Sequence, residues 1–340
     1  MDISIAMASY NGELFLPSQL DSLASQSLQP SELVITDDGS TDRTAEIVAE
    51  FAKKAPFPVR FHRNKTRLGY SDNFLKAASL CRGDLIAFSD QDDVWLSHKL
   101  ARCAACFQDS SVMLAVHSGE MVDETLKPIG RLFPEIYRDA VTSPLAMPPG
   151  RNSSGFAMVF RPSLPLIFHS ARPWSSFDQT EPMIHDQWLM FLSHVFGKTA
   201  FIHEPLVLYR RHDSTATRPV SLKVNEMIRY SLKSTGDTYS KQAGWAAHRA
   251  SYLEENIKLL PENQQFMAIQ GASHYREIQT ILQQRSNLYQ TDATLWTRFS
   301  SLLNLVARGE YSQRSKAELG FRAFLKDTGL GLLRLDRLFQ

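Results

Sequence analysis

The chain has 340 residues, of which 43% are hydrophobic and 21% are charged. It is long enough to bury a substantial core in one large domain with an appendage. Lys and Arg number 37 against 36 Asp and Glu, and this balance excludes binding to nucleic acid or to an acidic membrane by bulk charge. Any partner has to be recognised locally, and we expect no nucleic acid among the partners.

The beginning of the chain and its cysteines indicate a reducing compartment. Residues 1–8 enter an apolar strand directly, without the basic region or the cleavage site of a secretion signal. No apolar run reaches the ~20 residues that cross a bilayer. The three cysteines, Cys81, Cys103 and Cys106, are an odd number, and no second Cys or His pair accompanies Cys103 and Cys106 to form a zinc site. We therefore expect a cytoplasmic protein with free, buried cysteines.

The first 120 residues alternate short β-branched runs with longer helical patterns, which predicts an α/β fold with a mostly parallel central sheet flanked by helices. The predicted strands are Ile3–Ala8, Leu33–Thr36, Val59–His62 and Leu85–Ser89. The predicted helices are Leu14–Ser25, Arg43–Lys54, Asn73–Leu80 and Leu96–Phe107.

The second half of the chain divides into a mixed segment and a helical one. We predict a long loop or lid at Leu126–Pro149, a strand at Gly155–Phe160, a helix at His185–Phe196, short strands at Phe201–Ile202 and Leu206–Tyr209, and a linker at Asp213–Pro219. Residues 221–340 show only helical patterns, so we predict a domain at 1–215 and an all-helical extension at 216–340. The final segment, Phe324–Phe339, mixes leucines with basic residues, as a packed helix or a membrane-surface helix does.

Polar loops follow three of the predicted strands, at Ser9–Gly12, Asp37–Asp42 and Asp90–Asp93. In open parallel sheets ligands bind at the carboxyl ends of the strands. One acidic loop would be explained by a helix N-cap, which Ser40 or Asp42 can supply. Carboxylates gathered from two loops at one edge of the sheet indicate a ligand site instead.

Asp90 and Asp92 are separated by one residue at the end of a buried strand, where their repulsion has to be relieved by a cation. A hard divalent ion suits carboxylates and keeps coordination positions for phosphate. Neither a Gly-x-x-x-x-Gly-Lys-Ser/Thr loop nor a Gly-x-Gly-x-x-Gly turn is present to bind phosphate directly. The pattern therefore indicates a metal that holds a nucleotide diphosphate.

These motifs together resemble the family 2 glycosyltransferases of the GT-A fold. The resemblance is carried by Ser9-Tyr10-Asn11-Gly12, Gln26, Asp37-Asp38-Gly39-Ser40-Thr41-Asp42, Leu68-Gly69, Gly83-Asp84 and Asp90-Gln91-Asp92-Asp93. Order and spacing match over the first 110 residues, and later pieces extend the match to residue 213. The resemblance implies a Rossmann-like GT-A sheet with a nucleotide-binding half at 1–110 and an acceptor-binding half at 111–215. It also implies an inverting sugar transfer.

The resemblance assigns roles to individual residues. The implied nucleotide-sugar-binding residues are Ala8, Tyr10, Asp37, Asp38, Arg67, Asp90 and Arg211. The loop at residues 8–10 and Asp37 would contact the base, and Arg67 would contact the base or the diphosphate. Asp90 would contact the ribose or donor sugar, and Arg211 or its neighbour Arg210 would contact the leaving diphosphate. The two arginines equally suit structural ion pairs. Asp92 would bind the metal, while Asp93 would assist it or cap the following helix.

Asp186 occupies the place of the family's catalytic base, an acidic residue at a helix start. A carboxylate with a pKa near ~4 is a competent base only against a hydroxyl whose acidity rises in the transition state. The alternative is an ordinary helix N-cap. His212, in Tyr209-Arg210-Arg211-His212, matches a histidine that binds the metal in some family members. Imidazole suits Mn²⁺ better than Mg²⁺, and we expect one of these two ions as cofactor.

The implied substrates are a UDP- or dTDP-sugar donor and a glycan or lipid-linked saccharide acceptor. Rhamnose is the first choice, because Asp90–Asp93 and His185–Trp188 resemble segments of bacterial rhamnosyltransferases. The pathway would be assembly of a bacterial surface polysaccharide such as lipopolysaccharide, at the inner face of the cytoplasmic membrane, with peripheral contact through the C-terminal helices.

Three alternatives stay open. A sugar-nucleotide pyrophosphorylase would need a Gly-rich loop with a Lys/Arg signature after the first strand. A phosphoacceptor receiver domain would end after five strand–helix units. A nucleotide-sugar-binding scaffold without activity would not need Asp92, Asp186 and His212, all of which are present.

Overall fold

The structure is a computed structural model that describes residues 1–132, 135–148, 150–168, 171–175, 181–213, 236–312 and 319–334. The chain forms two compact units. The first comprises residues 1–144, 152–169 and 184–219, and the second comprises residues 145–151, 170–183 and 220–340. Among the described helices, none combines the length and the apolar character needed to cross a membrane.

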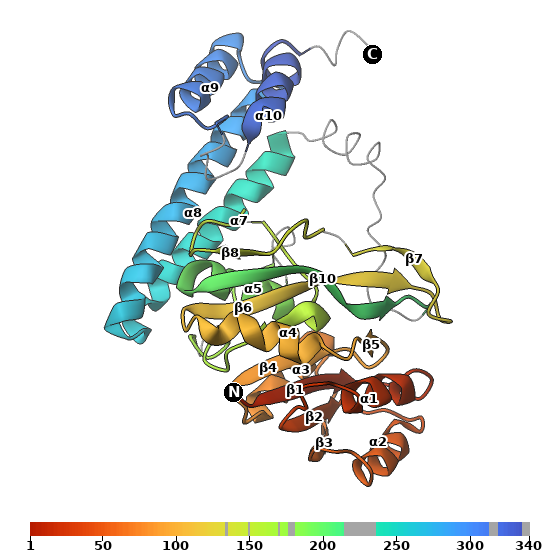
Figure 1. The fold of residues 1–340 in the computed structure, drawn as a ribbon. Coiled ribbons are helices and arrows are strands. Elements are labelled where there is room, and N and C mark those ends of the chain that lie inside the picture. Colours follow the sequence, from red (N-terminus) through yellow and green to blue (C-terminus); the bar gives the residue numbers. More distant parts are fainter. Residues whose placement is uncertain are drawn as a thin grey trace. The chain divides into compact units, whose positions relative to one another are not determined.

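One mixed sheet forms the centre of the first unit (Figure 1). Its strands are β1 (Ile3–Ser9), β2 (Glu32–Asp37), β3 (Val59–Arg63), β4 (Leu85–Ser89), β5 (Val94–Trp95), β6 (Val112–Val122), β7 (Pro128–Arg131), β8 (Ala140–Thr142), β9 (Met158–Phe160) and β10 (Lys198–Arg210). They lie in the order β3-β2-β1-β4-β9-β6-β10-β5, with β7 beside β6 and β8 beside β10. The first four strands are parallel, β9 runs antiparallel between β4 and β6, and β6 is parallel to β10.

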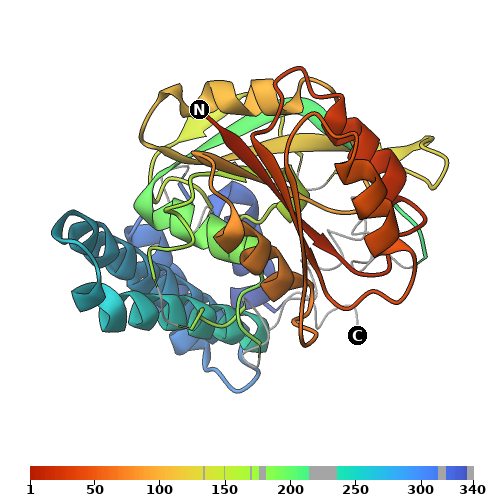
Figure 2. The same ribbon diagram turned by 90° about the horizontal axis from the view of Figure 1, so that it is seen from below.

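Helices cover both faces of the parallel part, which is why its inner strands read as nearly continuous apolar runs. Helices α1 (Leu16–Ala24) and α2 (Thr44–Ala52) lie on one face, and α3 (Tyr70–Leu80) and α5 (His185–Phe196) lie on the other (Figure 2). The change of face follows from the strand order, because right-handed crossovers to β2 and β3 run one way and the crossover to β4 runs the other. The boundary between β1 and β4 is therefore the switch point at which such sheets bind ligands.

The strand register brings three strand ends to the same edge. Ser9 is paired with Asp37, and Met7 is paired with Ser89. The loops that follow β1, β2 and β4 therefore start side by side. These are the three polar loops that the sequence predicts to converge.

The predicted N-terminal strands are confirmed to within two residues at their ends, and two later predictions were wrong. Residues 112–122 were not predicted as a strand, yet they form β6 in the middle of the sheet. The two short strands predicted within 201–209 form one strand, β10, whose pairing with β6 shifts on both sides of Pro205. Proline lacks the N–H that a regular ladder needs, and the shift breaks the alternation from which strands are predicted.

Several element boundaries in the structure also differ from those predicted from the sequence. The predicted loop at 126–149 contains β7 and β8, and the predicted strand at 155–160 begins as a 3-10 turn, η2 (Gly155–Ala157). Helix α4 (Lys99–Ala104) begins three residues later than predicted and ends in a 3-10 turn, η1 (Ala105–Gln108). Helix α3 begins three residues earlier than predicted, at Tyr70.

The described secondary structure of the second unit is helical, apart from one isolated bridge between Trp174 and Pro182, and the predicted all-helical extension is confirmed there. Its elements are α7 (Gly236–Asn256), η3 (Ile257–Leu259), α8 (Glu262–Tyr289), α9 (Leu295–Ala307), α10 (Gly320–Lys326) and a π-helical turn, η4 (Asp327–Leu332). Helices α7 and α8 pair along their length (Figure 1). The predicted linker beyond Asp213 and the end of the predicted segment at 324–339 beyond Arg334 lie outside the described residues.

A buried ion pair joins α8 to the π-helical turn. Both carboxylate oxygens of Asp327 accept from the Arg285 guanidinium at 2.8 Å. The hydroxyls of Tyr289 and Tyr311 donate to the same carboxylate at 2.7 and 2.9 Å. Asp327 has no exposed surface, so these four bonds replace the water that its charge loses on burial.

We predict that Asp327→Asn lowers the free energy of unfolding by about 3 kcal/mol, because it leaves the Arg285 charge buried without its counter-ion. Glu254→Gln is the matched control, since it breaks the exposed ion pair with Arg276 and should cost less than about 1 kcal/mol. Denaturant unfolding of both variants measures the difference. Equal midpoints for the two would contradict a stabilising role for the buried pair.

Candidate active site

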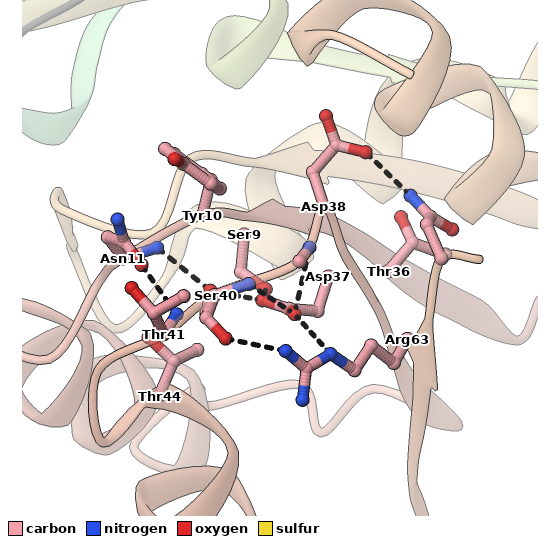
Figure 3. A network of polar contacts seen from close by, with 12 residues as sticks. Ser9, Tyr10, Asn11, Thr36, Asp37, Asp38, Ser40, Thr41, Thr44 and Arg63 are labelled. Carbon is pink, nitrogen blue, oxygen red and sulfur yellow. Dashed lines mark hydrogen bonds and ion pairs between the residues drawn. The ribbon is translucent and has the colours of Figure 1, made fainter. Parts of the chain in front are cut away.

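Asp37, the last residue of β2, is the centre of a closed polar network (Figure 3). Its carboxylate accepts hydrogen bonds from the Ser9 hydroxyl at 3.1 Å, the Gly39 amide at 3.2 Å, and both the amide, at 2.9 Å, and the hydroxyl of Ser40. The Arg63 Nε lies 4.0 Å from the carboxylate. Since Asp37 is buried, these donors take the place of water and fix the shape of the loop after β2.

The loop after β1 is fastened to the loop after β2. Asn11 has a φ of 48°, a left-handed conformation that asparagine tolerates better than most residues. Its amide donates to the Ser40 hydroxyl at 2.8 Å, and its side-chain oxygen accepts from the Thr41 amide at 2.9 Å (Figure 3). The Gly12 amide donates to the Thr44 hydroxyl at 2.8 Å. These bonds join the first two polar loops into one structure.

Asp38 holds a third loop, which contains Arg67. The Asp38 carboxylate accepts from the Leu68 amide at 2.7 Å and the Gly69 amide at 2.8 Å. The Arg67 guanidinium carbon lies 4.1 Å from the centre of the Tyr10 ring, in a cation–π contact. Both side chains are exposed. The structure thus brings two of the predicted nucleotide-binding residues together as an aromatic ring beside a cation.

Gln91 links the loop after β1 to the acidic loop after β4. Its side-chain oxygen accepts from the Tyr10 amide, and its side-chain nitrogen donates to the Tyr10 carbonyl, both at 3.0 Å. A Cβ atom on Gly12 would lie 2.4 Å from the same amide oxygen, so a larger residue there would displace the end of the Gln91 side chain. Ala8, the remaining predicted residue of this loop, is half-buried near the end of β1.

The aspartates of the acidic loop have different surroundings. Burial and the charge of Asp92 raise the pKa of Asp90 to about 8. Burial, together with the charges of Asp90 and Asp92, raises the pKa of Asp93 well above its usual value. Asp92 is half-buried, and its Oδ2 lies 2.8 Å from Nε2 of His212. The loop therefore gathers carboxyl groups whose ionised forms a cation would stabilise.

The contact between Asp92 and His212 fits two ligands of one divalent cation. Ligands at adjacent octahedral positions, each ~2.1 Å from the ion, lie about 3 Å apart, close to the separation found here. A carboxylate and an imidazole are also a suitable donor set. Among the residues that the structure describes, no group of three or more His, Cys, Asp or Glu side chains is arranged for a metal. A cation here would complete its coordination with water or substrate oxygens.

Arg210, the last residue of β10, holds the acidic loop in place. Its amide donates to Asp93 at 3.1 Å, and its Nε donates to the Asp92 carbonyl at 2.7 Å. Its other nitrogens donate to the Glu124 carbonyl at 2.6 Å and the Ser18 hydroxyl at 3.0 Å. Arg210 is buried, so its guanidinium is a structural group. Arg211, the second candidate arginine, is less buried, and its guanidinium donates to the Tyr209 hydroxyl at 2.7 Å.

Asp186, the predicted base, lies in the first turn of α5. Burial raises the pKa of its carboxyl to about 7, although the Gln187 amide, which donates to it at 2.6 Å, acts in the opposite direction. Asp186 lies close enough to Asp90 that its charge contributes to the raised pKa of Asp90. The predicted base therefore lies within electrostatic range of the acidic loop.

His185 fixes the start of α5. Its ring stacks on Phe74 with centroids 4.5 Å apart and meets the Phe88 ring edge-on at 5.4 Å. Its amide donates to the Ser71 hydroxyl at 2.9 Å. A Cβ atom on Gly155 would lie 2.3 Å from the ring, so the imidazole occupies space that only glycine leaves. These contacts anchor the turn that carries Asp186.

Two residues of the site were not selected from the sequence. Lys99 is fully buried and donates to the Phe156 carbonyl at 2.7 Å; burial lowers its pKa to about 7, and its charge lowers the pKa of Asp90. Tyr70 is half exposed, and burial together with the charge of Asp186 raises its pKa. A lysine within a helix is normally predicted to lie at the surface, and Tyr70 precedes the helix predicted from the sequence. The sequence therefore did not indicate that either residue belongs to the site.

The cysteines take no part in this site. All three are free, but only Cys103 is buried as expected, since Cys81 and Cys106 are half-buried. Burial raises the pKa of Cys81 and of Cys103 to about 12. Thiols that stay protonated are neither nucleophiles nor metal ligands at neutral pH.

We predict that Asp90→Asn raises the free energy of unfolding at pH 7 by roughly 1–3 kcal/mol while weakening nucleotide binding. A carboxyl whose pKa is raised on folding destabilises the folded state above its unfolded-state pKa, and asparagine removes that cost. Thermal unfolding at pH 7 measures the change. A variant less stable than the wild type would show that Asp90 contributes stabilising interactions instead.

Comparison with known proteins relates the first unit to one family. Residues 4–165 match the family model described as Glycosyl transferase family 2. An uncharacterized glycosyltransferase of Nostoc sp. is 27% identical over 224 residues, which covers 62% of this chain and 65% of that protein. The dTDP-rhamnosyl transferase RfbG of Shigella flexneri is 36% identical over 104 residues, which covers 29% and 36%. The chain thus spans less than two thirds of the length of these curated relatives.

Among solved structures, residues 1–349 of S. aureus TarS in complex with UDP-GlcNAc superimpose with a TM-score of 0.53 at 15% identity, covering 99% of this chain and 92% of that one. At this level of identity the likeness concerns the fold. Together with the family match, it confirms the predicted α/β GT-A fold with a helical C-terminal region.

Proposed function

We propose, since the chain belongs to the family 2 glycosyltransferases, that it transfers a sugar from a nucleotide diphosphate donor to a glycan hydroxyl with inversion at the anomeric carbon. One observation carries the proposal. Asp186 has a pKa raised to about 7 and lies within electrostatic reach of the acidic loop at Asp90. A candidate base and a candidate diphosphate site thus share one edge of the sheet.

We assign the nucleotide to the surface formed by Ala8, Tyr10 and Arg67. An exposed ring beside a guanidinium offers a flat base a stacking partner and offers phosphate a cation. Asp37 and Asp38 act in this proposal by holding the loops, because each carboxylate is engaged by groups of the protein.

The diphosphate is assigned to the acidic loop and its neighbours. Asp92 and His212 would hold Mn²⁺ or Mg²⁺, with Mn²⁺ favoured by the imidazole. Such an ion, when bound, supplies positive charge to the departing diphosphate. Arg211, which precedes His212 in the chain, would add a second cation. Asp90 would face the ribose or donor sugar.

Asp186 takes the proton of the acceptor hydroxyl as that oxygen attacks the anomeric carbon. The bond from the anomeric carbon to the diphosphate breaks with its electrons on the leaving group. A single displacement of this kind inverts the configuration. The raised pKa makes Asp186 a stronger base than an ordinary carboxylate, and it is ionised above neutral pH.

For the donor we propose a UDP- or dTDP-sugar, with rhamnose as first choice. The name of RfbG describes a dTDP-rhamnosyl transferase, and TarS was crystallised with UDP and with UDP-GlcNAc. The acceptor is a glycan or lipid-linked saccharide bound by residues 111–215, in assembly of a bacterial surface polysaccharide such as lipopolysaccharide. The transfer takes place in the cytoplasm, with peripheral contact of the protein at the membrane.

We predict that UDP or dTDP, but not GDP, binds in calorimetric titrations, at least about tenfold more tightly with Mn²⁺ than without it. Asp92→Ala should abolish the dependence on Mn²⁺. Asp21→Ala, which removes an exposed carboxylate on α1, is the control and should bind like the wild type. Folded protein that binds none of the nucleotides would refute the proposed donor site.

We also predict an acid limb with a pKa near 7 in the pH profile of kcat/KM, since Asp186 has to be ionised to accept a proton. The rate should fall about tenfold per pH unit below that value. Steady-state transfer assays over a pH series measure it, with donor affinity recorded at each pH. A rate that is independent of pH from about 5 to 8 would exclude Asp186 as the base.

A further inference from the structure

Helix α9 has an apolar face that is exposed to solvent. Leu295, Trp296, Phe299, Leu303 and Val306 are 69%, 75%, 44%, 54% and 46% exposed. Successive residues of an α-helix are rotated by about 100°, so these five side chains fall within one sector about 100° wide. Contiguous apolar surface of this kind marks a site of interaction.

This face is distinct from the one that packs within the unit. Leu302 and Leu305 are buried and pack with Ile281 and Leu288 of α8. Arg298, on the same side, is buried and donates to carbonyls at the end of α8. An amphipathic helix needs one apolar stripe to join a core. Helix α9 has that stripe and a second apolar face next to it.

The neighbouring α10 extends the apolar surface. Phe321 and Leu325, one turn apart, are 67% and 55% exposed, and Arg322 between them is also exposed. Phe324 of α10 and Leu332 of the following turn, η4, pack on the same hydrophobic cluster as the buried side of α9, and Figure 1 shows α10 next to α9.

The charges of this region are predominantly positive. Of the 37 Lys and Arg and the 36 Asp and Glu of the chain, segment 295–340 holds eight and four. One of the four acids, Asp327, is buried in its ion pair with Arg285. Arg298, one of the eight cations, is buried as well. Among the described residues of the segment, Arg308 and Arg322 are exposed, Lys326 and Arg334 are half-buried, and the acid Glu310 is half-buried. Positive charge therefore accompanies the exposed apolar face in the part of the segment that the structure describes.

We infer that this α9–α10 face, formed by Leu295, Trp296, Phe299, Leu303, Val306, Phe321 and Leu325, docks on the surface of an anionic lipid bilayer. The apolar side chains enter the boundary between headgroups and acyl chains, where Trp and Phe are favoured, and the cations meet the lipid phosphates. The proposed contact is made by α9 and α10, which lie N-terminal to the end of the segment Phe324–Phe339 considered in the sequence. It extends the peripheral membrane contact of the proposed function, and the docking itself requires no sugar transfer.

The test is flotation of the full chain with vesicles of phosphatidylcholine alone and of phosphatidylcholine mixed with phosphatidylglycerol. We expect binding at least about tenfold stronger to the anionic vesicles, weakened by salt. The double variant Trp296→Ser/Phe299→Ser should bind them at least about tenfold more weakly. Its matched control is Phe266→Ser/Ile269→Ser, which removes two exposed apolar side chains from α8 and should bind like the wild type.

Two outcomes would overturn the inference. One is equal vesicle binding by the two double variants. The other is a wild-type chain that binds no vesicles but self-associates in analytical ultracentrifugation, with the self-association lost in the α9 double variant. In that case the face would bind a second copy of the chain and not a bilayer. Circular dichroism of each variant checks that it is folded. Nucleotide titration of the same preparations separates this result from the proposed function, because the α9 variant should keep wild-type nucleotide affinity.

Discussion

Burial of carboxylates at one edge of the sheet, together with the repulsion that Asp90 and Asp93 experience there, is the constraint on which the rest of the site depends. Asp90, Asp93 and Asp186 have raised pKa values because burial has removed water from them, and the charge of Asp186 also acts on Asp90. Lys99 beneath the loop and the amide of Arg210 offset part of the cost. An arrangement that destabilises the free protein is retained where a ligand relieves it, and a cation with a diphosphate has the required charge.

The surrounding loops are held with little freedom. Asp37 fixes the loop after β2, Asp38 fixes the loop that carries Arg67, and Gln91 ties Tyr10 to the acidic loop. His185 fixes the start of α5 through its stacking on Phe74 and its bond to Ser71. A site whose supporting bonds are already made loses little entropy when the ligand binds, and its reactive groups stay at a defined separation.

The sequence predicts the parallel half of the fold well because its strands are buried on both faces and read as apolar runs. It fails at β6, where His117, Ser118 and Gly119 interrupt the apolar pattern, and at β10, where Pro205 does so. Motifs select the candidate aspartates, since their spacing is local. They cannot separate ligand-facing carboxylates from Asp37, which is engaged by its own loop, or select Lys99, whose burial depends on tertiary packing.

In the proposed site Asp92 binds the metal and Asp186 accepts the proton, and paired measurements on Asp186→Asn and Asp92→Ala separate these two roles. We expect Asp186→Asn to bind the donor nucleotide with Mn²⁺ like the wild type but to transfer sugar roughly 100- to 10,000-fold more slowly. Asp92→Ala should lose both properties. Glu46→Gln, which alters an exposed acid in the first turn of α2, should retain both. Transfer at the wild-type rate by Asp186→Asn would contradict the account.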